Sequence, residues 1–391
     1  MTHKTAITYW EYIGLDRLLA LQEGIEQDGD VKLVDEMHFI VIHQSIELMF
    51  KLLLKELRLA RDVLGSSFVP DEVLPEVVKH MGRAVESLRV ATGHFRLMGQ
   101  LNPLDFLTFR DKLGTSSGAQ SFQMRELEHL LGLPSSERRE VLRRLRDALP
   151  DPSVADRFED FILEPLGAVQ DQIAAQIEAK GRAGLDDAAD RWVAQHIQRA
   201  MEDIEANGTL RASLGDWLQR TPICASSPPR PDDPHHDETL DLDQRAVRAF
   251  IDDYLQRAAA AGWTPQQVDD LRLYLRGDDA HPRTWETERI RAALLFIEMY
   301  PDLPLLTWPR MLLDKLVELE EALVHFRNAH ARMVERVIGS RPGTGGSPGI
   351  LYLDLTRDTR VFPELIQIRG VLIPKHHRWN FPALADFGFR L

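Results

Sequence analysis

The chain has 391 residues, of which 44% are hydrophobic and 28% are charged, proportions typical of a globular protein. Its formal net charge of −14 argues against nucleic acid as a partner, because nucleic acids attract basic surfaces. The single cysteine, Cys224, excludes an internal disulfide and a multi-cysteine metal site, and it fits a reducing cytoplasm.

The sequence also lacks the usual signals for a membrane. No uninterrupted apolar run approaches the ~20 residues of a membrane span. The N-terminal "MTHKTAITYWEYIGLD" has no apolar core of a signal peptide. We therefore expect a cytoplasmic protein with no membrane partner.

Helical periodicity dominates the chain. Apolar residues recur three and four positions apart, with charged residues on the opposite face. The segments with this pattern are 33–64, 71–100, 153–180, 184–207, 242–261, 281–299 and 309–338. The best strand candidate is the short "GILYLDL" at 349–355. We predict an all-α, bundle-like fold in a single domain, 1–391, with no repeat of fixed period.

Two segments differ from this helical background. Residues 221–241 are rich in Pro, Ser and Asp, which predicts a flexible excursion. Their "HHDE" at 235–238 could suggest a metal site, but a solvated charge run is the favoured interpretation. Residues 374–391 contain Pro, aromatics and a His pair, and we expect them to pack as an extended C-terminal arm.

The first segment with potential chemistry is "FIVIHQSIELMFKL" at 39–52. On a helix, Phe39 and His43 lie one turn apart within an apolar stripe. A lone histidine in such a stripe is usually a core residue with satisfied ring nitrogens. By itself, this segment therefore favours a structural role for His43.

The second segment is 102–128, in which Phe106 and Arg110 stand one turn apart on a short helix that begins near Pro103. An arginine beside an aromatic ring suits a carboxylate attached to an apolar group. The turn "GTSSG" at 114–118 consists of small residues and allows a close approach of the backbone to a ligand. The alternative is a surface arginine that pairs with a neighbouring aspartate, either Asp105 or Asp111.

The third segment, "HFRNAHARMVERVIGSRPGTGGSPG" at 325–349, places His325 and His330 on a long helix before a glycine-rich loop. The loop is not a Walker phosphate loop, because no Gly-Lys-Ser/Thr follows the glycines and no strand precedes them. Its backbone and the Thr344 hydroxyl could clamp a ligand the size of an amino acid. A helical histidine in an all-α core could also be an axial ligand of haem iron.

Taken together, these segments resemble the tryptophan 2,3-dioxygenase family. The "GTGGS" sequence after a His-x-x-Met-Val helix is the most specific element. The similarity is weakest across 133–300. The blocks that carry it, in the order of the family, are "TYWEYIGLDRLLALQ" (8–22), "DEMHFIVIHQSIEL" (35–48), "PLDFLTFRDKLGTSSGAQSFQMRELE" (103–128), "HARMVERVIGSRPGTGGSPG" (330–349) and "FPELIQIRGVL" (362–372).

This resemblance implies an all-helical protein with haem b as its cofactor, usually a homotetramer. The family inserts both atoms of O2 into the indole C2–C3 bond of L-tryptophan and forms N-formylkynurenine. By position in the motifs, His330 resembles the proximal ligand of the haem iron and His43 the distal histidine. Phe39 would then lie against the indole, and Ser117 and Gly118 would contact the cofactor.

The remaining positions of the family motif concern the substrate. Arg110 matches the residue that pairs with the substrate carboxylate, and Thr344 matches the residue that contacts its ammonium group. Phe106 occupies an aromatic position of the same pocket. Tyr9 and Tyr12 match tyrosines that reach into the site of a neighbouring subunit.

Four positions depart from the usual family pattern. Val34 and Pro348 replace a histidine and a serine, Met49 replaces a tryptophan, and Ala119 replaces a phenylalanine. The last change would open space beside the haem, so that a substituted tryptophan could fit.

Two alternatives therefore stand beside a tryptophan dioxygenase. One is a haem-dependent mono-oxygenase or hydroxylase that acts on a substituted tryptophan or another aromatic amino acid. The other is an all-α interaction protein or haem sensor without turnover. The sequence also leaves open whether His43 acts as a base or only accepts a hydrogen bond from the indole.

Overall fold

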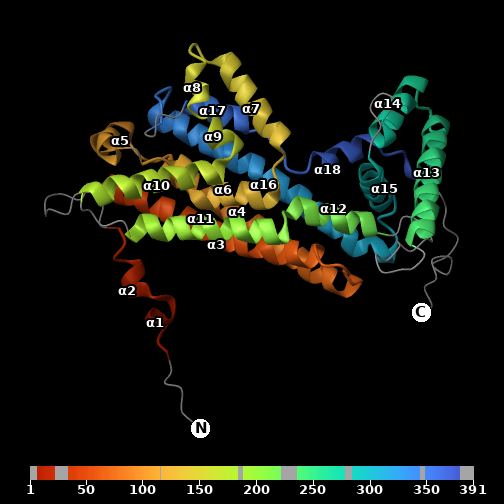
Figure 1. The fold of residues 1–391 in the computed structure, drawn as a ribbon, viewed down its shortest axis with the longest axis horizontal. Coiled ribbons are helices and arrows are strands. Elements are labelled where there is room, and N and C mark those ends of the chain that lie inside the picture. Colours follow the sequence, from red (N-terminus) through yellow and green to blue (C-terminus); the bar gives the residue numbers. More distant parts are fainter. Residues whose placement is uncertain are drawn as a thin grey trace, which may run out of the picture.

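The computed structural model describes residues 7–22, 34–114, 116–183, 188–221, 236–277, 284–343 and 348–378. Within these ranges the chain is helical and contains no strand, which confirms the predicted all-α class. The helices form an elongated body, from which a short N-terminal arm projects (Figure 1).

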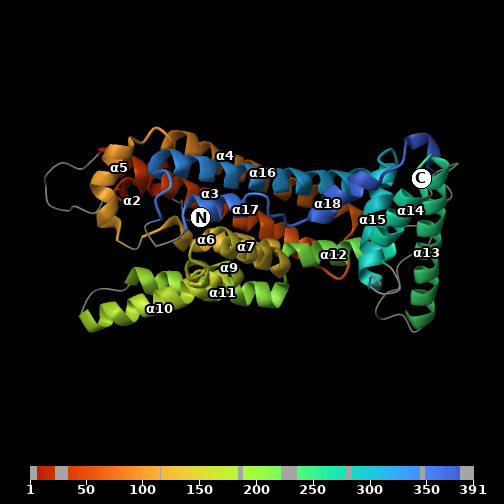
Figure 2. The same ribbon diagram turned by 90° about the horizontal axis from the view of Figure 1, so that it is seen from above.

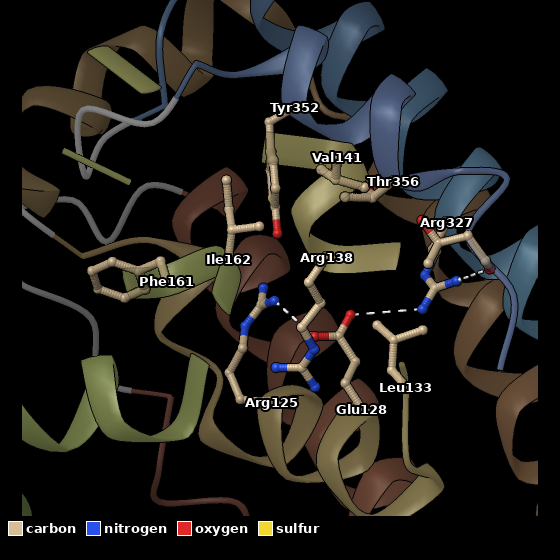
Figure 3. A pocket seen from close by; sticks show the side chains of 11 residues that line it. Arg125, Glu128, Leu133, Arg138, Val141, Phe161, Ile162, Arg327, Tyr352 and Thr356 are labelled. Atoms are coloured by element: carbon tan, nitrogen blue, oxygen red, sulfur yellow. Dashed lines mark hydrogen bonds and ion pairs between the residues drawn. The ribbon is translucent and has the colours of Figure 1, made fainter. Parts of the chain in front are cut away.

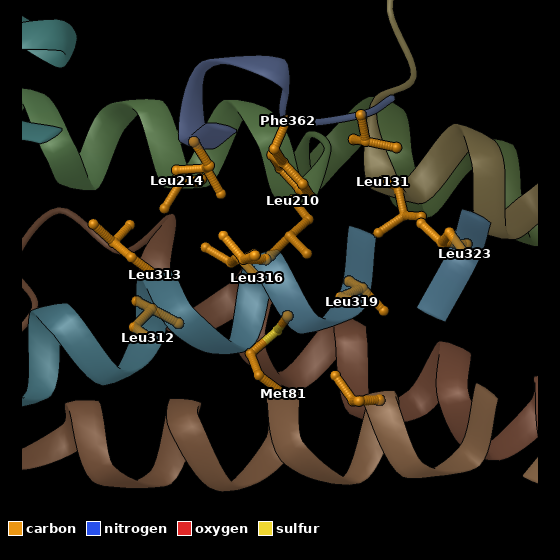
Figure 4. Packing of buried hydrophobic residues seen from close by; sticks show 14 of the residues in the cluster. Met81, Leu131, Leu210, Leu214, Leu312, Leu313, Leu316, Leu319, Leu323 and Phe362 are labelled. Atoms are coloured by element: carbon orange, nitrogen blue, oxygen red, sulfur yellow. The ribbon is translucent and has the colours of Figure 1, made fainter. Parts of the chain in front are cut away.

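Three long helices build the centre of this body: α3 (Val34–Leu64), α4 (Leu74–Met98) and α16 (Thr307–Ile338). Helix α4 packs against both α3 and α16, and the three run alongside one another (Figure 2). Each has an apolar stripe at helical spacing, as the sequence predicted. Figure 4 shows how leucines of α16 meet Met81 of α4 and Leu210 of α12 in the core.

Helix α3 needs a separate comment, because residues Asp35–Leu64 are long and apolar enough to cross a membrane by length and composition alone. Core helices of globular proteins meet the same criteria. Ile42, Phe50 and Leu53 on its inner face are almost fully buried, and the helix packs against α4, α6 and α12. The inner face is therefore that of a core helix, whereas only 28% of its most apolar stretch is buried within one chain.

Shorter helices cover the central three in groups. Helices α6, α10 and α11 contact one another, and α6 also contacts α3; helices α13, α14 and α15 gather at one end of the body. The arm consists of α1 (Tyr9–Ile13) and α2 (Leu15–Leu18). The other α-helices are α5 (Pro103–Arg110), α6 (Phe122–Leu131), α7 (Ser135–Ala148), α8 (Ser153–Asp156), α9 (Glu159–Leu163), α10 (Pro165–Ala183), α11 (Ala188–Asn207), α12 (Leu210–Arg220), α13 (His236–Ala260), α14 (Pro265–Arg276), α15 (Trp285–Met299), α17 (Ile350–Thr356) and α18 (Pro363–Gln367).

The strand candidate at 349–355 was wrong, because Ile350–Thr356 form helix α17. Leu351, Tyr352 and Leu355 pack on the apolar cluster of α7. Their spacing of one and four residues places them on one side of a helix, whereas in a strand they would face opposite sides. The tertiary contact with α7 thus decides between two conformations that a short apolar run leaves open.

Three other boundaries differ from the prediction. The segment 153–180 is divided into α8, α9 and α10, because Pro165 begins a new helix after Glu164 leaves the helical conformation. The predicted flexible excursion ends early, since α13 starts at His236; residues 222–235 lie outside the described residues. The C-terminal arm begins with a 3-10 turn at Lys375–His377 rather than extended chain, and 379–391 are not described.

Candidate active site

The structure gives His43 a defined tautomer. Its Nδ1 lies 2.8 Å from the carbonyl oxygen of Phe39, one turn earlier on α3. A carbonyl can only accept, so Nδ1 carries the proton and donates it. Burial lowers the pKa of His43, although the Phe39 carbonyl and the Glu47 carboxylate oppose this effect. The imidazole is therefore neutral near pH 7, and its Nε2 can accept a hydrogen bond.

Aromatic rings surround the His43 imidazole on one side. The Phe39 ring centroid lies 4.1 Å from that of His43 and 5.7 Å from that of Phe106. Phe109 stands edge-on to Phe106, with 5.2 Å between ring centroids. Both belong to α5, which starts as predicted at Pro103. These rings form an apolar wall suited to a flat aromatic ligand.

Arg110, at the end of α5, makes the ion pair with Asp111 that the sequence left open, but only at long range and from a largely buried side chain. It donates through Nη2 to the carbonyl oxygen of Pro342, 2.7 Å away. The highly exposed Asp111 is 3.9 Å away, at the limit of an ion pair. The Arg110 Nε is buried and has no hydrogen-bond partner among the residues that the structure describes. Part of the guanidinium is thus available to an anion.

The bond to Pro342 also brings the glycine-rich loop to Arg110. The two ends of this loop nearly touch, since a Cβ on Gly349 would lie 2.8 Å from the carbonyl oxygen of Arg341. Gly349 also has φ +63°, which favours glycine. Thr344 lies outside the described residues, but the chain on both sides of it is anchored next to Arg110.

His330 lies on α16, and its ring is stacked on Phe95 of α4 with 5.1 Å between centroids and 9° between planes. Neither ring nitrogen makes a hydrogen bond to any part of the chain that the structure describes. Burial, with smaller contributions from His43 and Arg125, lowers the pKa of His330 to about 4. The ring of Phe326, one turn before His330, lies 5.5 Å from that of Phe50 on α3, the helix that also carries His43. His325, the other histidine of the motif, is exposed.

Ser117 and Gly118 lie in the short turn between α5 and α6. Gly118 is exposed, and a Cβ added there would meet no atom within 4 Å. The turn is held beside α3 by Glu47, whose carboxylate accepts hydrogen bonds from Ser121 Oγ (2.6 Å) and Gln123 Nε2 (2.7 Å). Glu47 was not among the residues selected from the sequence, although its position one turn after His43 could have indicated that its side chain lies near the site.

These residues satisfy the requirements for a haem with one protein ligand. A neutral imidazole is the form that binds iron, and His330 offers one with no competing hydrogen bond among the described residues. The described residues contain no group of three or more His, Cys, Asp or Glu side chains that could hold a bare metal ion; the side chains of "HHDE" lie outside them.

Tyr9 and Tyr12 do not join this site within one chain. Both are strongly exposed, 70% and 80%, on the arm that projects away from the body (Figure 1). Of the atypical positions, Met49 packs against the main core. Pro348 directly precedes Gly349 in the loop. The side chains of Val34 and Ala119 lie outside the described residues.

Comparison with known proteins decides the family. The sequence profile of tryptophan 2,3-dioxygenase matches residues 1–197 and 237–372. The chain belongs to the tryptophan 2,3-dioxygenase family. It is 36% identical to tryptophan 2,3-dioxygenase 2 of Ralstonia nicotianae, over 94% of both chains. It is 37% identical to tryptophan 2,3-dioxygenase of Sorangium cellulosum, over 98% of this chain and 88% of the relative.

A tryptophan 2,3-dioxygenase-like protein of Xanthomonas campestris is 35% identical over 73% of this chain. The two fuller matches extend across the region 133–300, where the motifs are weakest. Membership of the tryptophan 2,3-dioxygenase family makes the protein an oxidoreductase. It also confirms the family that the ordered motifs around His43, Arg110 and His330 indicated.

Proposed function

We propose that the protein is a haem-dependent dioxygenase that cleaves the indole C2–C3 bond of L-tryptophan with O2 and forms N-formylkynurenine. The observation that carries this proposal is the pair of neutral imidazoles of His330 and His43. His330 has no hydrogen bond to a described residue, and His43 has its Nε2 free to accept one. Names of the relatives support tryptophan as the substrate.

The binding of the amino acid follows from the charges and surfaces of the site. Arg110 would hold the carboxylate through the part of its guanidinium that Pro342 does not occupy. Thr344, in the loop beside it, would contact the ammonium group. Phe39 and Phe106 would enclose the indole, since apolar walls with few polar groups are typical of such pockets.

His43 would orient the reacting bond. Its Nδ1–H is bound to the Phe39 carbonyl, so Nε2 is the acceptor for the indole N–H. This single hydrogen bond fixes the direction of the indole, and with it the position of C2 and C3. A haem bound by His330 would supply the activation of O2. Both oxygen atoms enter the product, so that no external reductant is consumed.

We further propose that the enzyme is a cytoplasmic homotetramer. Tyr9 and Tyr12 are exposed on an arm that contributes nothing to the site of its own chain. Helix α3 also presents apolar side chains to solvent, and exposed apolar patches on a protein surface are typical of subunit interfaces. Those on α3 are Met37, Val41, Leu48, Leu52 and Leu59.

The proposal is tested by adding haem to the purified protein and recording the Soret spectrum, followed by aerobic incubation with L-tryptophan. We expect a histidine-ligated spectrum and the near-ultraviolet absorbance of N-formylkynurenine. His330→Ala should lose both, whereas His325→Ala, a change on the same helix, should retain both. An unchanged spectrum in His330→Ala would exclude His330 as the ligand, and haem binding without an oxygenated product would exclude the proposed activity.

A further inference from the structure

A second cluster of charged groups lies between α6, α7, α16 and α17, and the active-site residues described above do not use it. A pocket there is lined by Arg125, Arg138 and Arg327, together with Glu128 and Tyr352. Figure 3 shows the three guanidinium groups converging on the single carboxylate, with the Tyr352 hydroxyl directed toward them.

The one carboxylate is shared between two of the arginines. Arg125 Nη1 lies 3.1 Å from a Glu128 oxygen, and Arg327 Nη2 lies 3.7 Å from the other. Arg138 donates instead to the carbonyl oxygen of Leu163, at 3.3 Å. In the described portion of the chain, no carboxylate lies within ion-pair distance of Arg138.

These groups are also removed from water. The side chains of Arg125 and Arg327 are 11% and 7% exposed, and Arg138 is 7% exposed as a residue. Three guanidinium charges against one carboxylate leave two positive charges in a buried site, and buried charges without partners are costly. Burial lowers the pKa of Arg138, and Arg125 and Arg327 lower it further against the opposing effect of Glu128. Within the described ranges, the Arg125 Nε has no hydrogen-bond partner.

We propose that this pocket binds carboxylate groups of a ligand. Planar guanidinium groups pair with carboxylates through two parallel hydrogen bonds, and a carboxylate would supply the missing negative charge. Tyr352 could donate a further hydrogen bond from its hydroxyl. We assign Arg138 the largest contribution, because it lacks a carboxylate partner among the described residues.

The position of the pocket indicates which carboxylates it receives. Arg327, which lines the pocket, lies three residues before His330 on α16, about one helical turn from it. A porphyrin whose iron is bound by His330 carries two carboxylates on one edge, and these are the nearest source. This part of the inference rests on the proposed haem dependence. A free carboxylate is the other source with the same chemistry.

The experiment compares haem with haem dimethyl ester, in which both carboxylates are blocked but the iron is unchanged. Binding is followed by quenching of tryptophan fluorescence in wild type, Arg138→Leu and Arg143→Leu. Arg143 is the matched control, because it lies on the exposed face of the same helix and pairs with Glu140 and Asp147. We expect wild type and Arg143→Leu to bind haem about tenfold or more tightly than the ester. In Arg138→Leu this preference should disappear.

A second measurement uses sodium propionate and the thermal unfolding midpoint of the haem-free protein. If the site receives free carboxylates, propionate raises the midpoint of wild type but not that of Arg138→Leu. Glu128→Gln removes the competing carboxylate and should increase either response. Equal binding of haem and its ester by wild type, together with no response to propionate, would overturn the inference. If wild type binds no haem at all, the proposed cofactor is wrong. The response to propionate alone then shows whether the pocket binds carboxylates.

Discussion

The two halves of helix α3 are built differently. Near its start, His43 Nε2 has no hydrogen bond to any residue that the structure describes, and the same holds for both ring nitrogens of His330 on α16. In the other half, Arg61 is 1% exposed and fully engaged. It binds Asp62 and both oxygens of Asp203.

Tyr254, on α13 at the far end of the body, resembles Arg61 in that its polar group has its hydrogen-bond partners. Its hydroxyl donates to the carbonyl oxygen of Val371, at 2.6 Å, and accepts from the amide of Ile373, at 3.1 Å. One hydroxyl thus attaches the C-terminal segment to α13. Buried polar groups whose hydrogen bonds are all made hold the helices together. Buried donors and acceptors without a partner mark the place where a ligand can bind.

The largest effect on stability is expected from Asp203→Asn. Hydrogen bonds from Arg61 hold the pKa of Asp203 well below its usual range, with further contributions from Arg58 and Asn207. The substitution removes the carboxylate that binds two nitrogens of the buried Arg61 and leaves it Asp62 and the Gly208 carbonyl, so we expect unfolding to cost about 3 kcal/mol less. The measurement is denaturant unfolding, with the exposed Asp147→Asn as a control that changes the free energy by less than about 0.5 kcal/mol.

The same residue predicts a dependence on pH. Because its folded pKa lies below the unfolded value of about 3.8, Asp203 stabilises the fold above pH 4. That contribution is lost as the pH falls through the acid range, and Asp203→Asn should be less sensitive there. Equal stability of Asp203→Asn and wild type would show that α11 does not depend on this ion pair.

A slightly smaller effect, on catalysis, is expected from Arg110→Leu. Loss of the charged hydrogen bonds to the substrate carboxylate should reduce kcat/KM for L-tryptophan about 100-fold. Arg143→Leu should leave kcat/KM unchanged, since Arg143 is exposed on α7. A further check is indole, which has no carboxylate: its binding should be equal in wild type and Arg110→Leu. If L-tryptophan also binds both equally, Arg110 serves only to position Pro342.

The smallest effect concerns His43 and pH. Loss of one neutral hydrogen bond in His43→Phe should raise KM for L-tryptophan roughly fivefold. Burial lowers the pKa of His43 below 6.5, so the KM of wild type should be constant above pH 6.5 and rise as the pH falls further. The protonated imidazole donates at Nε2 and can no longer accept the indole N–H.

His94→Phe is the matched control for His43→Phe. His94 makes the same bond from Nδ1 to a carbonyl four residues earlier, that of Val90 on α4. It should show wild-type KM across this range. A pH profile that is identical in wild type and His43→Phe would remove His43 from substrate binding.

Much of the fold could be predicted from the sequence, because long amphipathic helices carry their own signal. The stripes of α3, α4 and α16 gave their positions to within three residues at each end. Helix α7 was missed, since it is strongly polar and buries only Arg138, Val141, Leu142 and Leu145. Helix α12 was also missed, although Thr209 caps its start.

The candidate site was only partly predictable. His43, Arg110 and His330 stand in motifs of defined spacing, so the sequence could select them. The arginine pocket and the Arg61–Asp203 pair join segments far apart in the chain, and charged residues on unrelated helices carry no local signal of being neighbours. The missing hydrogen bonds of His330 and Arg138 are properties of packing, and they became visible only with the structure.

The central claim is tested most directly by supplying 18O2 with L-tryptophan to the haem-loaded protein and determining the mass of the product. We expect a product that contains two labelled oxygen atoms and an opened indole, and no such product with His330→Ala. A product with one labelled oxygen and an intact ring would contradict this claim and identify a mono-oxygenase.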